Sequence, residues 1–187
     1  MRRGFHHIGL ATPNFERCID FYTRVLGFDL SWQDVVKAPD GTVLIEHVFF
    51  DTGDGTYISF MSPKPASGAP ATWPGDVSTA LGLMPATYHF SFWLDSLVEL
   101  EAMRERLESH GVEVSQNIDH SFCESIYFLD PDGLALEFTV KTRAFNQGDA
   151  EPTHKHQPTF QDEWPNEPEK AKRFARLLKI PEDVLIP

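Results

Sequence analysis

The chain has 187 residues, of which 41% are hydrophobic and 24% are charged, proportions that are ordinary for a globular protein. Its formal net charge of −12, without any basic run, argues against nucleic acid or an anionic membrane as a partner. The two cysteines, Cys18 and Cys123, exclude a disulfide framework and a Cys-x-x-Cys metal site. Together with the absence of a signal-peptide pattern at the N-terminus, they predict a cytoplasmic protein.

The first half predicts one strand, one helix and three further strands. The strand covers residues 5–11, and a helix follows with Thr12 as its N-cap, Pro13 as its first residue and Gly27 at its end. Turns rich in Gly, Asp and Pro separate the three later strands. These strands are predicted at 28–36, 42–50 and 56–61.

The second half predicts the same order. A strand covers 88–94, and Ser96 with Glu99 forms a capping box for a helix that ends before Gly111. The turn Asp-Pro-Asp-Gly at 130–133 separates the last two strands. The three strands after the helix are predicted at 112–118, 122–129 and 134–140.

The sequence therefore predicts an α+β protein built from two βαβββ modules. A segment rich in Pro, Gly, Ala and Ser links them. In the C-terminal extension a short helix is predicted over 168–179, with apolar residues suited to docking, while His154 and His156 are assigned no role. The first module, the linker, the second module and the extension are predicted at 1–62, 63–86, 87–142 and 143–187.

Two histidines occupy the same position in the repeat. His7 and His89 each lie on the first strand of a module, on the face that also carries small residues such as Gly9 and Ser91. Each histidine alone is compatible with an ordinary core residue. Because both fall at the same repeat position, we interpret this face as the lining of a cavity.

The segment 118–137 carries three further candidates, His120, Tyr127 and Glu137. Glu137 lies within an apolar strand, where a carboxylate is costly unless something pairs with it. A metal cation is the natural partner. The spacing thus predicts a metal site with acid–base side chains beside it.

The repeat with His on its first strand and Glu on its last resembles the vicinal oxygen chelate superfamily. Its members include glyoxalase I, bleomycin- and fosfomycin-resistance proteins and extradiol ring-cleaving dioxygenases. The resemblance covers residues 5–141. It implies that the two modules form a cupped, partly open mixed β-sheet barrel around a divalent metal.

From His120 to Glu137 the chain is similar to the extradiol dioxygenase signature over its whole length. That resemblance implies a metal triad of His7, His89 and Glu137. It also implies that His120 and Tyr127 lie beside the substrate and oxygen.

The first-module position that matches Glu137 is Ser59. Glyoxalase I enzymes usually supply a glutamate at both positions, so the serine favours a three-ligand metal with open sites. Two imidazoles and one carboxylate suit non-haem Fe(II) that binds substrate and O₂ together. Mn(II) or another divalent metal fits the same ligands.

One departure from the extradiol pattern concerns a catalytic histidine that those enzymes usually carry on the last strand of the preceding module. Residues 55–59 contain no histidine. His47 alternates with Phe49 on a neighbouring strand, so it is a candidate to replace the missing group. The alternative is that His47 is a strand histidine bonded to a neighbour.

Together these features predict an Fe(II)-dependent extradiol-type dioxygenase that cleaves a small catecholic substrate with O₂. The alternatives are a glyoxalase-type isomerase or lyase, which Ser59 disfavours, and a bleomycin-resistance-like binding protein, which the triad disfavours. Neither nucleic acid nor a membrane is expected as a partner. We expect a homodimer, because the predicted tail helix is suited to docking and because proteins of the resembled family commonly form dimers.

Overall fold

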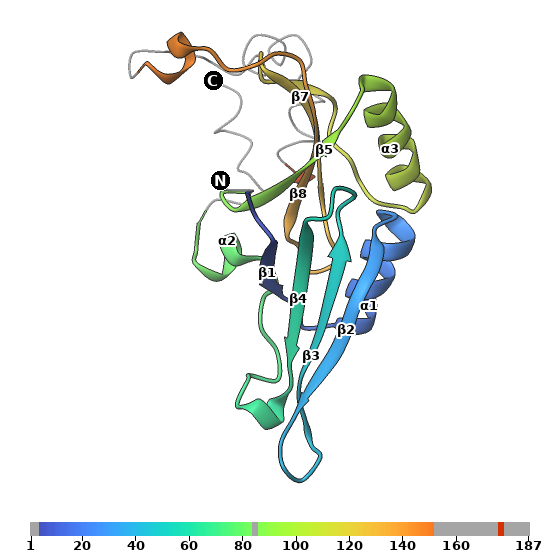
Figure 1. The fold of residues 1–187 in the computed structure, drawn as a ribbon, viewed down its shortest axis with the longest axis vertical. Helices are drawn as coiled ribbons and strands as arrows, with labels where there is room; N and C mark the ends of the chain where they lie inside the picture. The colour runs from blue at the N-terminus through green and yellow to red at the C-terminus, as the bar shows by residue number, and fades with distance from the viewer. Residues whose placement is uncertain (1–3, 84–85, 152–175, 178–187) are drawn as a thin grey trace. The chain divides into compact units, whose positions relative to one another are not determined.

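The computed structural model describes residues 4–83, 86–151 and 176–177. The chain divides into two compact units: Met1–Ala80 together with Asp130–Gly133, and Leu81–Leu129 together with Leu134–Pro187. Each unit contains one four-stranded sheet (Figure 1). The histidines of the tail and most of its predicted helix lie outside the described residues. Arg176 and Leu177 are helical.

The first unit contains a four-stranded mixed sheet with the order β1-β4-β3-β2 (Figure 1). β1 pairs in parallel with β4, and the other pairs are antiparallel. The helix α1 (Phe15–Asp20) continues as a π-helical turn at Phe21–Val25. The strands are β1 (His7–Ala11), β2 (Asp29–Lys37), β3 (Val43–Asp51) and β4 (Tyr57–Pro63).

The second unit repeats this arrangement with the strand order β5-β8-β7-β6. β5 is parallel to β8, and the rest of the sheet is antiparallel. The helix is α3 (Leu97–Ser109). The strands are β5 (His89–Leu94), β6 (Ile118–Asp119), β7 (Cys123–Leu129) and β8 (Ala135–Lys141). The predicted α+β class and repeated βαβββ order are therefore confirmed, and each sheet is open.

Short elements occur outside the two repeats. They include α2 (Val77–Ala80) and 3-10 turns at Pro65–Ser67 and Gln147–Ala150. Among the described residues, no helix has the length and apolar character needed to cross a membrane.

Each sheet buries one face. In the first unit, Tyr22 packs on Phe50 and Phe60, with ring centroids 5.3 and 4.7 Å away. In the second unit, Phe128 stacks on Phe138 at 5.4 Å, and all four of these phenylalanines are almost completely buried. Alternation along the strands then directs the intervening side chains to the opposite face, where the candidate histidines lie.

The helix of the first unit begins later than predicted. Asn14 is its N-cap, since its side chain accepts a hydrogen bond from the Arg17 amide. The Thr12 hydroxyl instead donates to Asp132 at 2.5 Å. Thr12 therefore makes a long-range contact and does not cap the helix, although the local sequence predicts it as the N-cap.

The predicted strand over 112–118 is also wrong for most of its length. Only Ile118–Asp119 forms a strand, while Val114 makes a single bridge to Phe128. Hydrogen bonds with side chains take the place of the regular hydrogen bonds between strands. The Tyr127 amide donates to the Ser115 hydroxyl, and Arg104 donates to the Ser115 carbonyl. These contacts satisfy the backbone without a regular strand.

Candidate functional site

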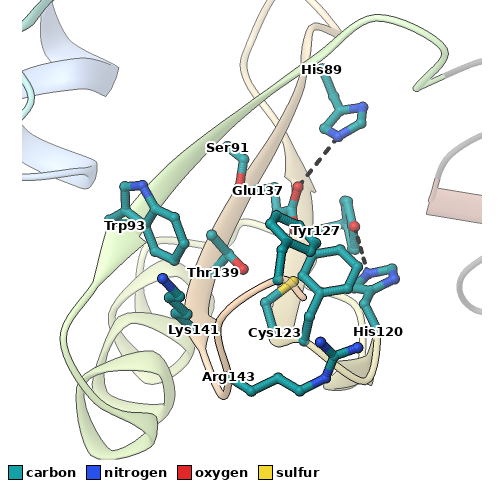
Figure 2. Close-up of a pocket in the computed structure, with 12 residues that line it drawn as sticks. His89, Ser91, Trp93, His120, Cys123, Tyr127, Glu137, Thr139, Lys141 and Arg143 are labelled. Atoms are coloured by element: carbon teal, nitrogen blue, oxygen red, sulfur yellow. Dashed lines mark hydrogen bonds and ion pairs between the residues drawn. The ribbon is translucent and has the colours of Figure 1, made fainter. Parts of the chain in front are cut away.

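A cavity of about 470 Å³ opens on the face of the second sheet opposite α3 (Figure 2). Every residue that lines it belongs to the second unit. It is lined by His89, Ser91, Trp93, His120, Phe122, Cys123, Tyr127, Glu137, Thr139, Lys141, Arg143 and Phe145.

Glu137 lies in the middle of this face because of the register of its strand. It pairs with Ser91 on β5 and with Tyr127 on β7, so both neighbours point the same way. The residue is only 5% exposed. Its Oε2 lies 3.3 Å from His89 Nε2, the contact drawn in Figure 2.

His89 is oriented by its other ring nitrogen. Nδ1 lies 3.0 Å from the carbonyl oxygen of Ala86, and a carbonyl only accepts, so this nitrogen carries the proton. Nε2 then faces the Glu137 carboxylate. Two lone pairs in that position repel each other, so a proton or a metal cation belongs between them.

The electrostatics of the pair agree with this geometry. The hydrogen bond to Glu137 raises the pKa of His89 above its ordinary value, although burial acts in the opposite direction. Burial alone raises the pKa of Glu137, but hydrogen bonds from His89 and Ser125 outweigh it, so the pKa lies below its usual range. An ionised carboxylate and an imidazole held through its Nδ1–H are a typical donor set for a divalent metal. These two residues therefore fit the metal that the sequence implies.

Tyr127 and His120 form a second pair beside the first. The Tyr127 hydroxyl lies 2.9 Å from His120 Nε2. Burial, followed by the charge of Glu137, raises the pKa of Tyr127 above its ordinary value. The phenol is therefore neutral and holds a proton that it can share with the imidazole or with a bound molecule.

The other predicted metal ligand, His7, lies in the first unit and is not among the residues that line the cavity. Its Nδ1 lies 2.9 Å from Nδ1 of His6, and its ring meets Phe49 edge-on at 5.2 Å. Of the predicted triad, the structure brings His89 and Glu137 together. Among the described residues, no group of three or more His, Cys, Asp and Glu side chains is placed to hold a metal.

His47 also lies in the first unit, on the same sheet face as Phe49, whose ring is 4.7 Å away. Its Nδ1 is 3.3 Å from Asp34 Oδ1, and its buried Nε2 has no hydrogen-bond partner among the described residues. Both of these contacts are with residues of its own unit.

The strand pairing shows that Ser59 in the first sheet and Glu137 in the second sheet occupy equivalent positions. Gly9 pairs with Ser59 in the first sheet, and Ser91 pairs with Glu137 in the second. Ser59 is buried and donates to the carbonyl of Ile8 at 3.2 Å. Where the second unit has the Glu137 carboxylate, the first unit thus has a hydroxyl that is hydrogen-bonded to a backbone carbonyl of the same sheet.

Several cavity residues were missed by the sequence reasoning. Thr139 and Lys141 follow Glu137 at two-residue spacing, so strand alternation was the signal that could have found them. Arg143 and Phe145 follow the end of β8, where no periodic signal reaches. Trp93, on β5, also lines the cavity.

The chain matches the model of the Glyoxalase/Bleomycin resistance protein/Dioxygenase superfamily over residues 4–138. Catechol-2,3-dioxygenase of Bacillus subtilis (strain 168) is 30% identical over 149 residues, 78% of this chain and 45% of that protein. Biphenyl-2,3-diol 1,2-dioxygenase 2 of Rhodococcus globerulus is 27% identical over 139 residues, 73% of this chain and 62% of that protein. The chain thus spans less than two thirds of the length of either relative.

Solved structures show the same fold. A glyoxylase/bleomycin resistance protein/dioxygenase domain from Frankia sp. EAN1pec has a TM-score of 0.58 and 19% identity, covering 75% of this chain and 99% of that one. The fosfomycin resistance protein FosX of Listeria monocytogenes has a TM-score of 0.53 and 22% identity, covering 76% and 96%. With the repeated βαβββ fold, the family match establishes that this chain belongs to the Glyoxalase/Bleomycin resistance protein/Dioxygenase superfamily.

Proposed function

We propose that this protein is an Fe(II)-dependent extradiol-type dioxygenase that cleaves a small catecholic substrate with O₂. One observation carries the proposal: the His89–Glu137 pair and the Tyr127–His120 pair share one aromatic-walled cavity. The two curated relatives, named as dioxygenases of catechol and of a biphenyl diol, support the same reaction class. We assign the protein to the cytoplasm, in keeping with its two free, buried cysteines.

We propose His7, His89 and Glu137 as the metal ligands. When bound, Fe(II) would supply adjacent coordination sites for two vicinal substrate oxygens and for O₂. Mn(II) is the alternative for the same donors. The third ligand, His7, comes from the same chain or from a second copy in a homodimer.

The roles of Tyr127 and His120 follow from their own contacts. A neutral phenol beside an ionised carboxylate is a hydrogen-bond donor toward a substrate oxygen. His120, 2.9 Å from that phenol, can take up the proton that a catechol hydroxyl loses or return it to the product. Trp93, Phe122 and Phe145 give the cavity aromatic walls that suit a planar ring.

The ligand assignment is tested by replacing Glu137. Protein purified without oxygen should contain close to one iron per chain, and Glu137→Ala should lose nearly all of it, because the carboxylate supplies the charge that neutralises the metal. Metal content is measured by plasma mass spectrometry. Glu101→Ala, which removes an exposed carboxylate on α3, is the matched control and should retain its iron.

The reaction is tested by adding catechols and then O₂ to the anaerobic, Fe(II)-loaded protein. Yellow ring-fission absorbance should develop together with oxygen uptake. Absence of both signals across a broad catechol panel, with turnover of a hemithioacetal instead, would favour a glyoxalase-type reaction. Tight binding of an aromatic compound by a protein without metal would favour sequestration.

A further inference from the structure

The cavity continues along β8 beyond the candidate metal ligand. Thr139 and Lys141 lie on the same strand face as Glu137, and both line the cavity. Strand residues rise about 3.3 Å each, so the Cα atoms of Glu137 and Lys141 are roughly 13 Å apart. In Figure 2, Lys141 lies beside Trp93, on the other side of Thr139 from Tyr127. Lys141 therefore places an ammonium in the part of the cavity beside Trp93, away from the His89–Glu137 pair.

The two cations that line the cavity, Lys141 and Arg143, differ in their contacts. Arg143 is occupied: its two terminal nitrogens lie 2.7 and 2.9 Å from the Asp149 carboxylate, and its Nε donates to the Ser121 carbonyl at 3.1 Å. For Lys141, by contrast, the described residues supply no ion pair or side-chain hydrogen bond. Lys141 is an exposed residue that lines the cavity.

The charge of the rest of the chain makes this lysine more significant. With a net charge of −12, the protein repels anions at long range, although salt screens that effect beyond about 10 Å. A local ammonium beside the aromatic side chain of Trp93 supplies short-range attraction for an anionic group. A neutral substrate would make no use of it.

We infer that the substrate carries an anionic group on a short side chain and that Lys141 binds it while the two vicinal oxygens lie at the Glu137 end. The inference rests on the proposed function for the identity of the oxygen-bearing end. It narrows the substrate class from catechols in general to catechols with an acidic side chain. Lys141 is thereby a specificity residue that acts on binding and takes no part in the proton transfers.

The test compares dihydrocaffeate with its methyl ester, which has the same ring but no charge. Binding to the full-length Fe(II) protein is measured anaerobically by calorimetry, where no turnover occurs. The acid should bind about two- to fivefold more tightly than the ester, the range of an exposed ion pair at a cavity rim. Lys141→Gln should remove this preference, and Lys141→Arg should retain it.

Lys37→Gln is the matched control, because it removes the same charge at a first-unit position that does not line the cavity. It should leave the acid preference intact, and thermal unfolding should show that every variant is folded. Equal affinity for acid and ester in the parent protein, or a preference that survives in Lys141→Gln, overturns the inference.

Oxygen uptake with each compound separates this inference from the proposed function. Cleavage of both compounds with equal affinity would leave the dioxygenase assignment in place and remove the role of Lys141. An acid preference that depends on Lys141, without oxygen uptake or ring fission, would retain the anion site and contradict ring cleavage.

Discussion

At the scale of single residues, the neutral phenol of Tyr127 is the group whose removal most directly tests the chemistry. It is 9% exposed, touches His120 and neighbours Glu137 across the strand pair. Tyr127→Phe should retain its iron, since the metal donors are unchanged, and should lower kcat by about 10²-fold through loss of a proton donor. Steady-state oxygen uptake and metal content measure the two effects. Loss of metal in this variant would show a structural role instead.

The two cysteines give a second prediction at this scale. Cys18 is 4% exposed, and burial, followed by the charges of Asp130 and Asp132, raises the pKa of its thiol. Because the thiolate is the reactive form, Cys18 should react very slowly with a disulfide reagent in the native protein. In the Cys18→Ser variant the remaining thiol, Cys123, lines the cavity, so dihydrocaffeate should slow its labelling. Unchanged labelling would place the compound elsewhere.

At the scale of elements, the turn at 130–133 contributes more than a reversal of direction. Asp132 accepts from the Thr12 hydroxyl and pairs with Arg17, each at 2.5 Å, and Tyr22 donates to Asp130 at 3.3 Å. These contacts lie within the first unit, to which the turn belongs. The turn therefore stabilises the start of α1 and the buried tyrosine behind it.

Replacing Asp132 should be destabilising. Asp132→Ala removes both acceptors and should lower the free energy of unfolding by about 1–2 kcal/mol, a range that allows for the half-exposed Arg17. Urea unfolding measures the difference. Glu101→Ala, which breaks an exposed contact to Arg104 on one helix, should cost less than about 0.5 kcal/mol. Equal losses for both variants would contradict a special role for the turn.

The strands and helices show what the sequence could predict. Two-residue alternation located the strands and the faces that carry His7, His89 and Glu137, because burial of one sheet face leaves a periodic signal. The N-cap was misplaced at Thr12 because its hydroxyl bonds to a residue 120 positions away. Nothing in a local pattern reveals such a contact.

The candidate site was predictable to a similar extent. The spacing around 118–137 predicted the neighbourhood of Tyr127 and Glu137, which the sheet register brings side by side. Alternation along β8 could have found Lys141, but a charged residue at a strand end usually faces solvent, and Arg143 lies beyond the strand. Whether such a residue lines a cavity depends on how the segment after the strand folds back, which periodicity does not encode.

At the scale of the whole molecule, our proposal assigns the metal one ligand from the first unit, His7. His7→Ala should lose iron as fully as Glu137→Ala, whereas His6→Ala, a change at the adjacent histidine, should retain it. Plasma mass spectrometry of anaerobically purified variants measures both. Iron retained by His7→Ala would mean that the third donor lies elsewhere. Sedimentation of mixed variants would show whether two copies associate, which a donor from a second copy requires.

The two sheets have matching registers, so the residues at equivalent positions of the two modules can be compared directly. Equivalent positions hold Ser59 and Glu137, and their cross-strand neighbours are Phe49 and Tyr127. The first copy thus carries His7 and His47 beside Phe49 but no carboxylate at the position of Glu137, while the second copy carries Glu137 and Tyr127. Apart from the proposed ligand His7, substitutions on the face that carries Phe49 and Ser59 would leave the titratable groups of the second sheet unchanged, whereas substitutions along β8 would alter the cavity that we propose for the substrate.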